Sequence, residues 1–277
     1  MRRSLIFYLS LAAIAIVLLL SFLIFYLEQK AARSLAENGV NNKTGLTKVD
    51  SSQAQKNPTV VQVNFQTDDG VNIVGDYYDN PAAKFVGIVA PMFRADRKAY
   101  ADFCRRLQAN GYSVLAIDWR GQGASVDSSK GKLNYQNFSQ ADFQNAIFDL
   151  EAANKFLRGK GFQTNNQFLI GSGLGANLVL KFLGGNNNFR LAVLVAPRLN
   201  DSRVKIESLI DPSLGPKLIL VVSASDSAAV EAVTFLNQKM PGSQTIIYPS
   251  GNDSRGQFLD DPGLSDKIIM WLKTKLF

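Results

Sequence analysis

Hydrophobic and polar positions divide the chain into three regions. Residues 5–27 are almost wholly apolar and uncharged, residues 28–57 are polar with few apolar anchors, and from Pro58 onward short apolar runs alternate with amphipathic ones. As a helix, the first run spans roughly 30 Å, which matches the hydrocarbon core of a bilayer. We therefore predict a membrane anchor over residues 1–27, a flexible polar tether over residues 28–57 and one folded domain over residues 58–277.

Within the predicted domain, apolar runs of strand length alternate with segments of helical period, such as the i, i+3, i+4 stripe from Phe143 to Leu157. Asp68-Asp69-Gly70 separates the first two strands as a hairpin turn. Other helices are expected over residues 96–110 and at the end of the chain, to Leu272. The eight expected strands cover residues 60–65, 71–78, 85–90, 113–117, 168–170, 191–195, 218–222 and 245–248. This order predicts an α/β fold with an eight-stranded, mostly parallel sheet, flanking helices and no large lid.

The flanks of the apolar run bear on membrane orientation. Arg2 and Arg3 precede it as in an uncleaved signal anchor, which predicts a single-pass cell-membrane protein with its folded domain outside the cytoplasm. Lys30 and Arg33 on the other flank nearly balance these charges, so the positive-inside count discriminates weakly. A cleaved signal peptide ending near Ala31-Ala32 is the alternative.

Composition narrows the possible chemistry. The chain has 30 Lys and Arg against 23 Asp and Glu, a net charge of +7, but the basic residues are scattered. This favours a basic surface near the anionic headgroups of a lipid bilayer over nucleic-acid binding. With no histidine and the single Cys104, which is expected to be a buried helix residue, a zinc site is poorly supported. Asp68-Asp69 and Asp260-Asp261 lack the spacing of a calcium loop, so no cofactor is expected.

Residues 168–178 form a predicted strand, a glycine-rich turn and the start of a helix, which resembles the G-x-S-x-G nucleophile elbow. In that motif the nucleophile lies midway between two glycines, because the strained turn leaves no room for side chains at the flanking positions. Gly173 satisfies this rule, since Gly171 and Gly175 flank it, whereas Ser172 has bulky neighbours at the corresponding positions. We therefore place Gly173 at the nucleophile position and Ser172 beside it.

A second stretch carries a family resemblance. Asn110-Gly-Tyr-Ser-Val-Leu-Ala-Ile-Asp-Trp-Arg-Gly-Gln-Gly-Ala-Ser125 is similar to the corresponding segment of α/β-hydrolases of the serine aminopeptidase and lysophospholipase-like branch. The resemblance extends from about Val60 to the C-terminus. It implies an α/β-hydrolase fold and places the acid of the catalytic triad at Asp226.

The same resemblance implies that other parts of the catalytic apparatus are missing. The family histidine corresponds to Arg255, which stays protonated at physiological pH and cannot act as a base. Ala90-Pro91 replaces the family's His-Gly on the oxyanion side, and proline has no N–H to donate. The triad geometry implied by the family would bring Arg255 within hydrogen-bond reach of Asp226.

Gly171-x-Gly173-x-x-Ala176 also fits a dinucleotide-binding fingerprint. That motif needs an acidic residue at the end of the next strand, where this chain has Val195-Ala196-Pro197-Arg198. The hydrolase resemblance is therefore preferred.

Taken together, the sequence predicts a membrane-anchored, catalytically inactive α/β-hydrolase-like protein that binds a small molecule or another protein. One alternative is an unconventional esterase-like or peptidase-like hydrolase in which Ser172, Asp226 or Asp253 is recruited by a shifted turn. A purely structural tethered module is a further alternative.

Overall fold

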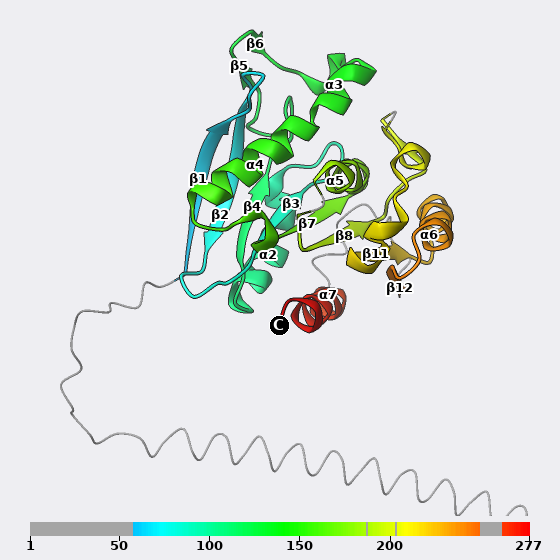
Figure 1. Cartoon of the computed structure of the whole chain (residues 1–277). Coiled ribbons are helices and arrows are strands. Elements are labelled where there is room, and N and C mark those ends of the chain that lie inside the picture. The colour runs from blue at the N-terminus through cyan, green and yellow to red at the C-terminus, as the bar shows by residue number, and fades with distance from the viewer. Residues whose placement is uncertain (1–57, 187, 203, 250–261) are drawn as a thin grey trace, which may run out of the picture. The chain divides into compact units, whose positions relative to one another are not determined.

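A central sheet of eight strands, in the order β1-β2-β4-β3-β7-β8-β11-β12, organises the computed structural model (Figure 1). The structure describes residues 58–186, 188–202, 204–249 and 262–277, all within one compact unit. The strands are β1 (Thr59–Gln66), β2 (Asn72–Asp79), β3 (Val86–Ala90), β4 (Ser113–Ile117), β7 (Gln167–Ser172), β8 (Leu191–Val195), β11 (Leu218–Ser223) and β12 (Gln244–Tyr248). The predicted eight-stranded, mostly parallel sheet is thus confirmed.

The pairing fixes where the ends of the strands lie. The two pairs β1–β2 and β2–β4 are antiparallel, and the pairs from β4 through β3, β7, β8 and β11 to β12 are parallel. The parallel strands therefore end together along one side of the sheet, here called the carboxyl edge, and begin together along the opposite side, the amino edge. Because β1 is reversed twice relative to β4, it also begins at the amino edge.

Helices cover both faces of the sheet. Helices α4 (Ile147–Gly159) and α5 (Leu174–Gly185) lie on one face, and α2 (Ala101–Ala109) and α7 (Pro262–Leu276) on the other, while α6 (Ser227–Lys239) packs against β11 (Figure 1). Strands β3, β4, β8 and β11 are buried along their whole length. Their continuous apolar runs, without alternation, are what a parallel sheet covered on both faces requires.

Several details differ from the sequence-based expectation. The helix predicted over residues 96–110 is a 3-10 turn, η1 (Arg97–Tyr100), followed by α2. The helical stripe beginning at Phe143 is interrupted at Ala146, so that α3 (Gln140–Asn145) precedes α4. Cys104 is fully buried on α2, as expected.

Two small ribbons were not predicted. They are β5 (Asp127–Ser128) with β6 (Gly131–Lys132), and β9 (Asn200–Asp201) with β10 (Val204–Lys205). Between β10 and β11 the chain forms only the 3-10 turns η4 (Ile206–Leu209) and η5 (Pro212–Lys217), with no large lid. Two further 3-10 turns, η2 (Tyr135–Asn137) and η3 (Thr164–Asn166), precede α3 and β7.

The predicted anchor over residues 1–27 and tether over residues 28–57 lie outside the described residues. Among the helices that the structure does describe, none combines the length and the apolar composition needed to cross a bilayer.

Candidate functional site

The glycine-rich turn lies at the carboxyl edge, between β7 and α5. Gly173 has φ 53° and ψ −120°, a conformation that only glycine adopts without strain. Its N–H donates to the Val195 carbonyl of the neighbouring strand at 2.9 Å, which fixes the turn against β8. The turn therefore has the strained strand-to-helix geometry that the elbow motif requires.

Gly171 and Gly175 allow the chain to pack closely on either side of this turn. A Cβ on Gly171 would overlap the Gly175 carbonyl group, and one on Gly175 would lie 2.5 Å from the Ala90 oxygen. Among the described residues, the atom nearest to a Cβ on Gly173 would be the Met92 Cβ, in a close contact of 3.3 Å. The described residues therefore exclude side chains beside the turn and leave space for a small one at its centre.

Two polar side chains are relevant to the centre of the turn, the carboxylate of Asp201 and the hydroxyl of Ser172. The position that a Gly173 Cβ would occupy is 3.7 Å from Oδ2 of Asp201, a residue of the β9–β10 ribbon that also accepts a hydrogen bond from the Ser202 hydroxyl at 3.0 Å. Sequence reasoning missed Asp201, because a two-residue strand has no recognisable period. The Ser172 side chain is buried, and its hydroxyl has no hydrogen-bond partner within the described part of the chain.

The oxyanion side of the turn is formed by the end of β3. Pro91 supplies a carbonyl, which accepts a hydrogen bond from the Trp119 indole at 2.7 Å, but no N–H. The next N–H, that of Met92, donates to the Tyr100 hydroxyl at 3.0 Å. Neither of these two backbone positions offers an uncommitted donor to an oxyanion.

Asp226 follows β11 at the carboxyl edge, where the sequence placed the acid. Both of its carboxylate oxygens are bound by Arg198, Nη1 contacting Oδ1 and Nη2 lying 2.8 Å from Oδ2. Oδ1 also accepts the N–H of Ala229 at 3.2 Å and so caps α6. Arg255 lies outside the described residues, as does Asp253, so the expected contact between Arg255 and Asp226 stays a prediction.

Arg198 is held in place through its own backbone. Its N–H donates to Oδ1 of Asn177 at 3.1 Å, and its carbonyl accepts from Nδ2 of Asn177 at 2.8 Å. Asn177 is fully buried on the first turn of α5. Helix α5 therefore positions Arg198, which neutralises the charge of Asp226. The one sequence signal for Arg198 was its place directly after a buried strand, at the edge where such side chains converge.

The Asp118-Trp-Arg segment builds a buried support beneath the carboxyl edge. Asp118 accepts the N–H groups of Arg97 at 2.7 Å and Ala124 at 2.8 Å, and it pairs with the Arg97 guanidinium. Arg120 bridges Asp149 on α4, with Nε at 2.8 Å from Oδ1, and Asp69 in the β1–β2 hairpin, with Nη1 at 2.6 Å from Oδ2. The family-like motif is therefore a structural brace.

The charges in this brace shift its carboxyl groups in opposite directions. Complete burial raises the pKa of Asp149 to about 6, and Arg120 offsets this only in part. Burial also acts to raise the pKa of Asp69, but hydrogen bonds from Arg120 and Thr67 prevail and lower it. In the folded protein the charged form is therefore disfavoured at Asp149 and favoured at Asp69.

A cavity of about 560 Å³ opens at the same edge. Four aromatic side chains and two polar ones share most of its lining, namely Phe93, Tyr135, Phe138, Phe143, Arg94 and Ser202. Ser202 is adjacent to Asp201, which brings the cavity near the Gly173 turn. Phe93 stacks edge-on against Tyr135 and Phe143, with ring centroids 5.1 and 5.3 Å apart. The cavity suits a ligand that combines an aromatic part with polar groups. In the described ranges, no group of three or more acidic or cysteine side chains could hold a metal ion.

Comparison with known proteins agrees with this geometry. Residues 89–232, slightly more than half of the chain, match the family model described as serine aminopeptidase, S33. No curated protein sequence matches the chain.

Solved structures with this fold include several esterases. The Pyrococcus furiosus esterase Pf2001 has 17% identity and a TM-score of 0.62, over 84% of this chain and 100% of the esterase. The esterase domain of a Rhodothermus marinus protein has 17% identity and a TM-score of 0.61, over 79% of this chain and 100% of that domain. A predicted CIB-like hydrolase from Thermoplasma acidophilum has 15% identity and a TM-score of 0.60, over 79% of this chain and all of the other. At these identities the likeness concerns the fold.

Proposed function

The chain belongs to the serine aminopeptidase S33 family of α/β-hydrolases, and from the changes at its elbow we propose that it is a membrane-anchored, catalytically inactive member that binds a ligand at the carboxyl edge. Residues 1–27 would hold it in the membrane and residues 28–57 would tether the folded domain. The ligand would be a small molecule or a segment of another protein with an apolar or aromatic group.

Two facts together support this proposal. The elbow turn has a glycine, Gly173, at its central position, and the chain contains no histidine. Hydrolysis by a serine nucleophile needs a hydroxyl at the centre of the turn and a neutral base within hydrogen-bond reach of it. Gly173 provides no hydroxyl. Arginine at the position that the family resemblance gives to histidine stays protonated and cannot accept a proton.

The remaining polar groups favour binding over proton transfer. Asp226 is engaged by two N–H groups of Arg198, so its charge is compensated within the protein. The room above Gly173 and the aromatic cavity beside it are then available for a ligand that does not react.

A hydrolase activity assay tests this proposal. The full-length chain in detergent micelles should neither hydrolyse p-nitrophenyl esters and aminoacyl amides above background nor react with a fluorophosphonate probe. The Ser172→Ala variant serves as the matched control, since it removes the one serine next to the turn. Stoichiometric labelling of the wild type that disappears in Ser172→Ala would show that Ser172 is a nucleophile and would overturn the proposal.

A second candidate function is hydrolysis by a rearranged site, and the position of Asp201 favours it specifically. A carboxylate oxygen 3.7 Å from the position of an elbow Cβ is close enough to activate a water molecule there. This candidate predicts esterase activity that is lost in Asp201→Asn and retained in Ser172→Ala. Equal rates for wild type and Asp201→Asn at background level would eliminate it.

A further inference from the structure

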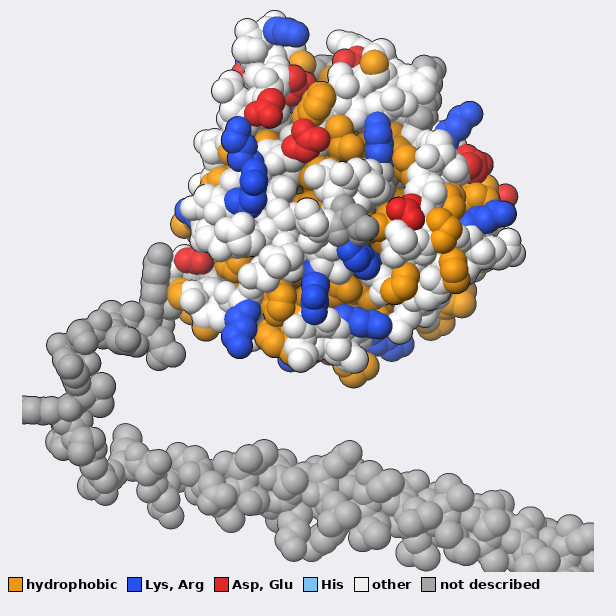
Figure 2. Space-filling model, in the orientation of Figure 1, with side chains coloured by type: hydrophobic (Ala, Val, Ile, Leu, Met, Phe, Trp, Pro, Cys, Tyr) orange, Lys and Arg blue, Asp and Glu red, His pale blue; other side chains and the backbone are white. Residues whose placement is uncertain are grey.

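The amino edge, opposite the candidate site, carries a cluster of cationic side chains. These residues precede β3, β7 and β8 or end α7, and all are exposed. We call them the basic face: Lys84, Arg158, Lys160, Arg190, Lys273 and Lys275. In the face shown in Figure 2, Lys and Arg side chains lie over both the upper and the lower part of the domain, whereas Asp and Glu side chains lie mostly in the upper part.

Part of the basic face is joined by direct contacts. The ring of Phe85, next to Lys84, packs edge-on against Phe277 at the end of α7, with centroids 5.3 Å apart. Lys273 donates to the Asn110 side chain, which precedes β4, at 2.9 Å. These contacts bring the end of α7 beside the start of β3 and β4.

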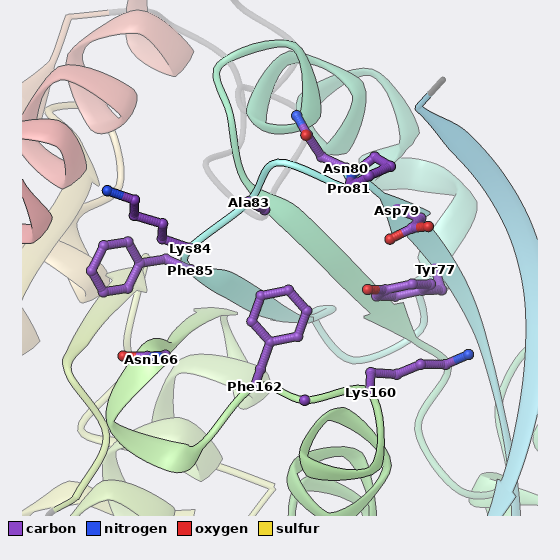
Figure 3. A pocket seen from close by; sticks show the side chains of 11 residues that line it. Tyr77, Asp79, Asn80, Pro81, Ala83, Lys84, Phe85, Lys160, Phe162 and Asn166 are labelled. Atoms are coloured by element: carbon purple, nitrogen blue, oxygen red, sulfur yellow. The ribbon is translucent and has the colours of Figure 1, made fainter. Parts of the chain in front are cut away.

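A groove of about 720 Å³ lies within this face. Figure 3 shows Phe162 at its centre, with Lys84 and Lys160 extending away on opposite sides. Asp79 is the acidic side chain in its lining. The groove therefore has an aromatic side chain at its centre and a lysine on either side, and such long basic side chains can reach an interface of lipid headgroups.

The charges of the two edges are compensated differently. At the carboxyl edge Arg97, Arg120 and Arg198 each pair with at least one carboxylate. None of the six cations of the basic face forms an ion pair with any residue that the structure describes. Burial, together with the nearby positive charge of Arg190, lowers the pKa of Lys217 at the start of β11. The six cations of the basic face therefore lie at the amino edge without an ion-pair partner among the described residues, although Arg106 at the same edge pairs with Asp266.

The first strand of the folded domain begins at this edge. Thr59, the first residue of β1, pairs with Asp79, whose side chain lines the groove. Val60 and Val61, the next two residues, are 48% and 47% exposed. The chain that leads from the predicted membrane segment thus joins the domain beside the basic face and next to exposed apolar side chains.

We propose that the basic face docks on the anionic phospholipid surface of the membrane that holds residues 1–27, so that the carboxyl edge faces away from the bilayer. The proposal rests on the proposed anchor. A tether of this length keeps the domain at a high effective concentration near the bilayer, so weak contacts are sufficient. Attraction between exposed lysines and anionic lipid acts over about one Debye length and weakens with added salt.

The test uses the full-length chain in nanodiscs of phosphatidylcholine, with or without phosphatidylglycerol. Cys104 is fully buried, so a cysteine introduced at exposed Thr274, between Lys273 and Lys275, can be labelled selectively with an environment-sensitive fluorophore. A label at Ser129→Cys, in the β5–β6 turn at the far end of the domain, serves as the reference (Figure 1). We expect phosphatidylglycerol to shift the emission of the Thr274 label to the blue and to leave the Ser129 label unchanged, with the shift reversed by salt.

Matched charge variants separate a local effect from a general one. Lys160→Gln, Arg190→Gln and Lys275→Gln together should reduce the fraction of docked domain roughly tenfold or more. Lys98→Gln, Lys130→Gln and Lys205→Gln make the same change in net charge at exposed positions outside the basic face and should leave docking unchanged. Equal responses of the two labels, or equal effects of the two variants, would overturn the proposal. Binding of single-stranded RNA in preference to phosphatidylglycerol vesicles would also overturn it.

This experiment keeps the docking proposal separate from the anchor. If the anchor failed but docking held, the chain would leave the nanodiscs and bind phosphatidylglycerol vesicles reversibly and in a salt-sensitive manner. If docking failed while the anchor held, the chain would stay in both kinds of nanodisc with no difference between the labels.

Discussion

Gly173 has a backbone conformation that any other residue would adopt only with strain. In active hydrolases a serine at the elbow accepts this cost because its hydroxyl is needed. We predict that Gly173→Ala lowers the free energy of unfolding by about 1 to 3 kcal/mol, since the site has room for a methyl group but the φ of 53° is unfavourable. Urea unfolding measures the change. Gly184→Ala on α5, where a Cβ meets no other atom, is the control and should be neutral or stabilising. Equal effects of both changes would contradict the strain argument.

The ion pair of Arg198 with Asp226 should contribute measurably to the stability of the fold. The two side chains are 19% and 10% exposed, so removing one leaves a poorly solvated charge. Arg198→Ala should destabilise the fold by about 3 kcal/mol, whereas Arg198→Gln combined with Asp226→Asn should cost less, because two neutral hydrogen-bonding groups remain. Thermal unfolding of the three chains provides the comparison. Equal, small losses for Arg198→Ala and for the double change would mean that leaving Asp226 without Arg198 costs little.

These residues mark how far the sequence could define the site. The register of the elbow followed from the spacing of Gly171, Gly173 and Gly175, because close backbone contacts restrict those positions directly. Arg198 could not be assigned as the partner of Asp226, since it lies 28 residues away on a loop with no periodic pattern. Asp201 was missed for a similar reason.

Among the elements, the hairpin β1–β2 and helix α4 are joined through Arg120, which bonds to Asp69 and Asp149. Burial places the pKa of Asp149 at about 6 in the folded protein, against an ordinary value of 3.8. The folded state therefore binds this proton more tightly than the unfolded chain. The resulting stabilisation is complete below pH 3.8 and is lost as the pH rises through 6.

We predict that the free energy of unfolding of the wild type, minus that of Asp149→Asn, falls as the pH is raised from 3.8 to 6 and is constant above that range. Urea titrations followed through the fluorescence of buried Trp119 would measure it. Asp142→Asn is a control of opposite sign, because hydrogen bonds from Ser139 lower the pKa of Asp142, so its contribution is lost as the pH falls. A rising difference for Asp149 would contradict the assigned direction.

Elements were easier to predict than their junctions. All eight sheet strands were expected. The inner ones followed from continuous apolar runs, because a strand buried on both faces needs several consecutive apolar residues, whereas the largely exposed β1 was marked by the hairpin turn at Asp68-Asp69-Gly70. The break at Ala146 was not expected, since the apolar stripe continues across it. The ribbons β5–β6 and β9–β10 are too short for any period to be visible.

In the folded domain, the candidate ligand site and the basic face lie at opposite edges of the sheet. The candidate ligand site and the buried ion pairs lie at the carboxyl edge, while uncompensated cations and the entry of the chain lie at the amino edge. If the basic face docks on the membrane as proposed, the carboxyl edge would face the aqueous side, where a ligand can reach it.

The last prediction concerns the anchor itself. The full-length chain should sediment with membranes and resist extraction at alkaline pH, because an uncharged apolar helix of this length is held by the hydrocarbon core rather than by charge. A chain lacking residues 1–27 should be released from neutral membranes and retain only a salt-sensitive association with anionic ones, carried by the basic face. Combining this deletion with Lys160→Gln, Arg190→Gln and Lys275→Gln should abolish the remaining association. If high salt alone released the full-length chain, residues 1–27 would form a peripheral contact and the membrane-spanning assignment would be wrong.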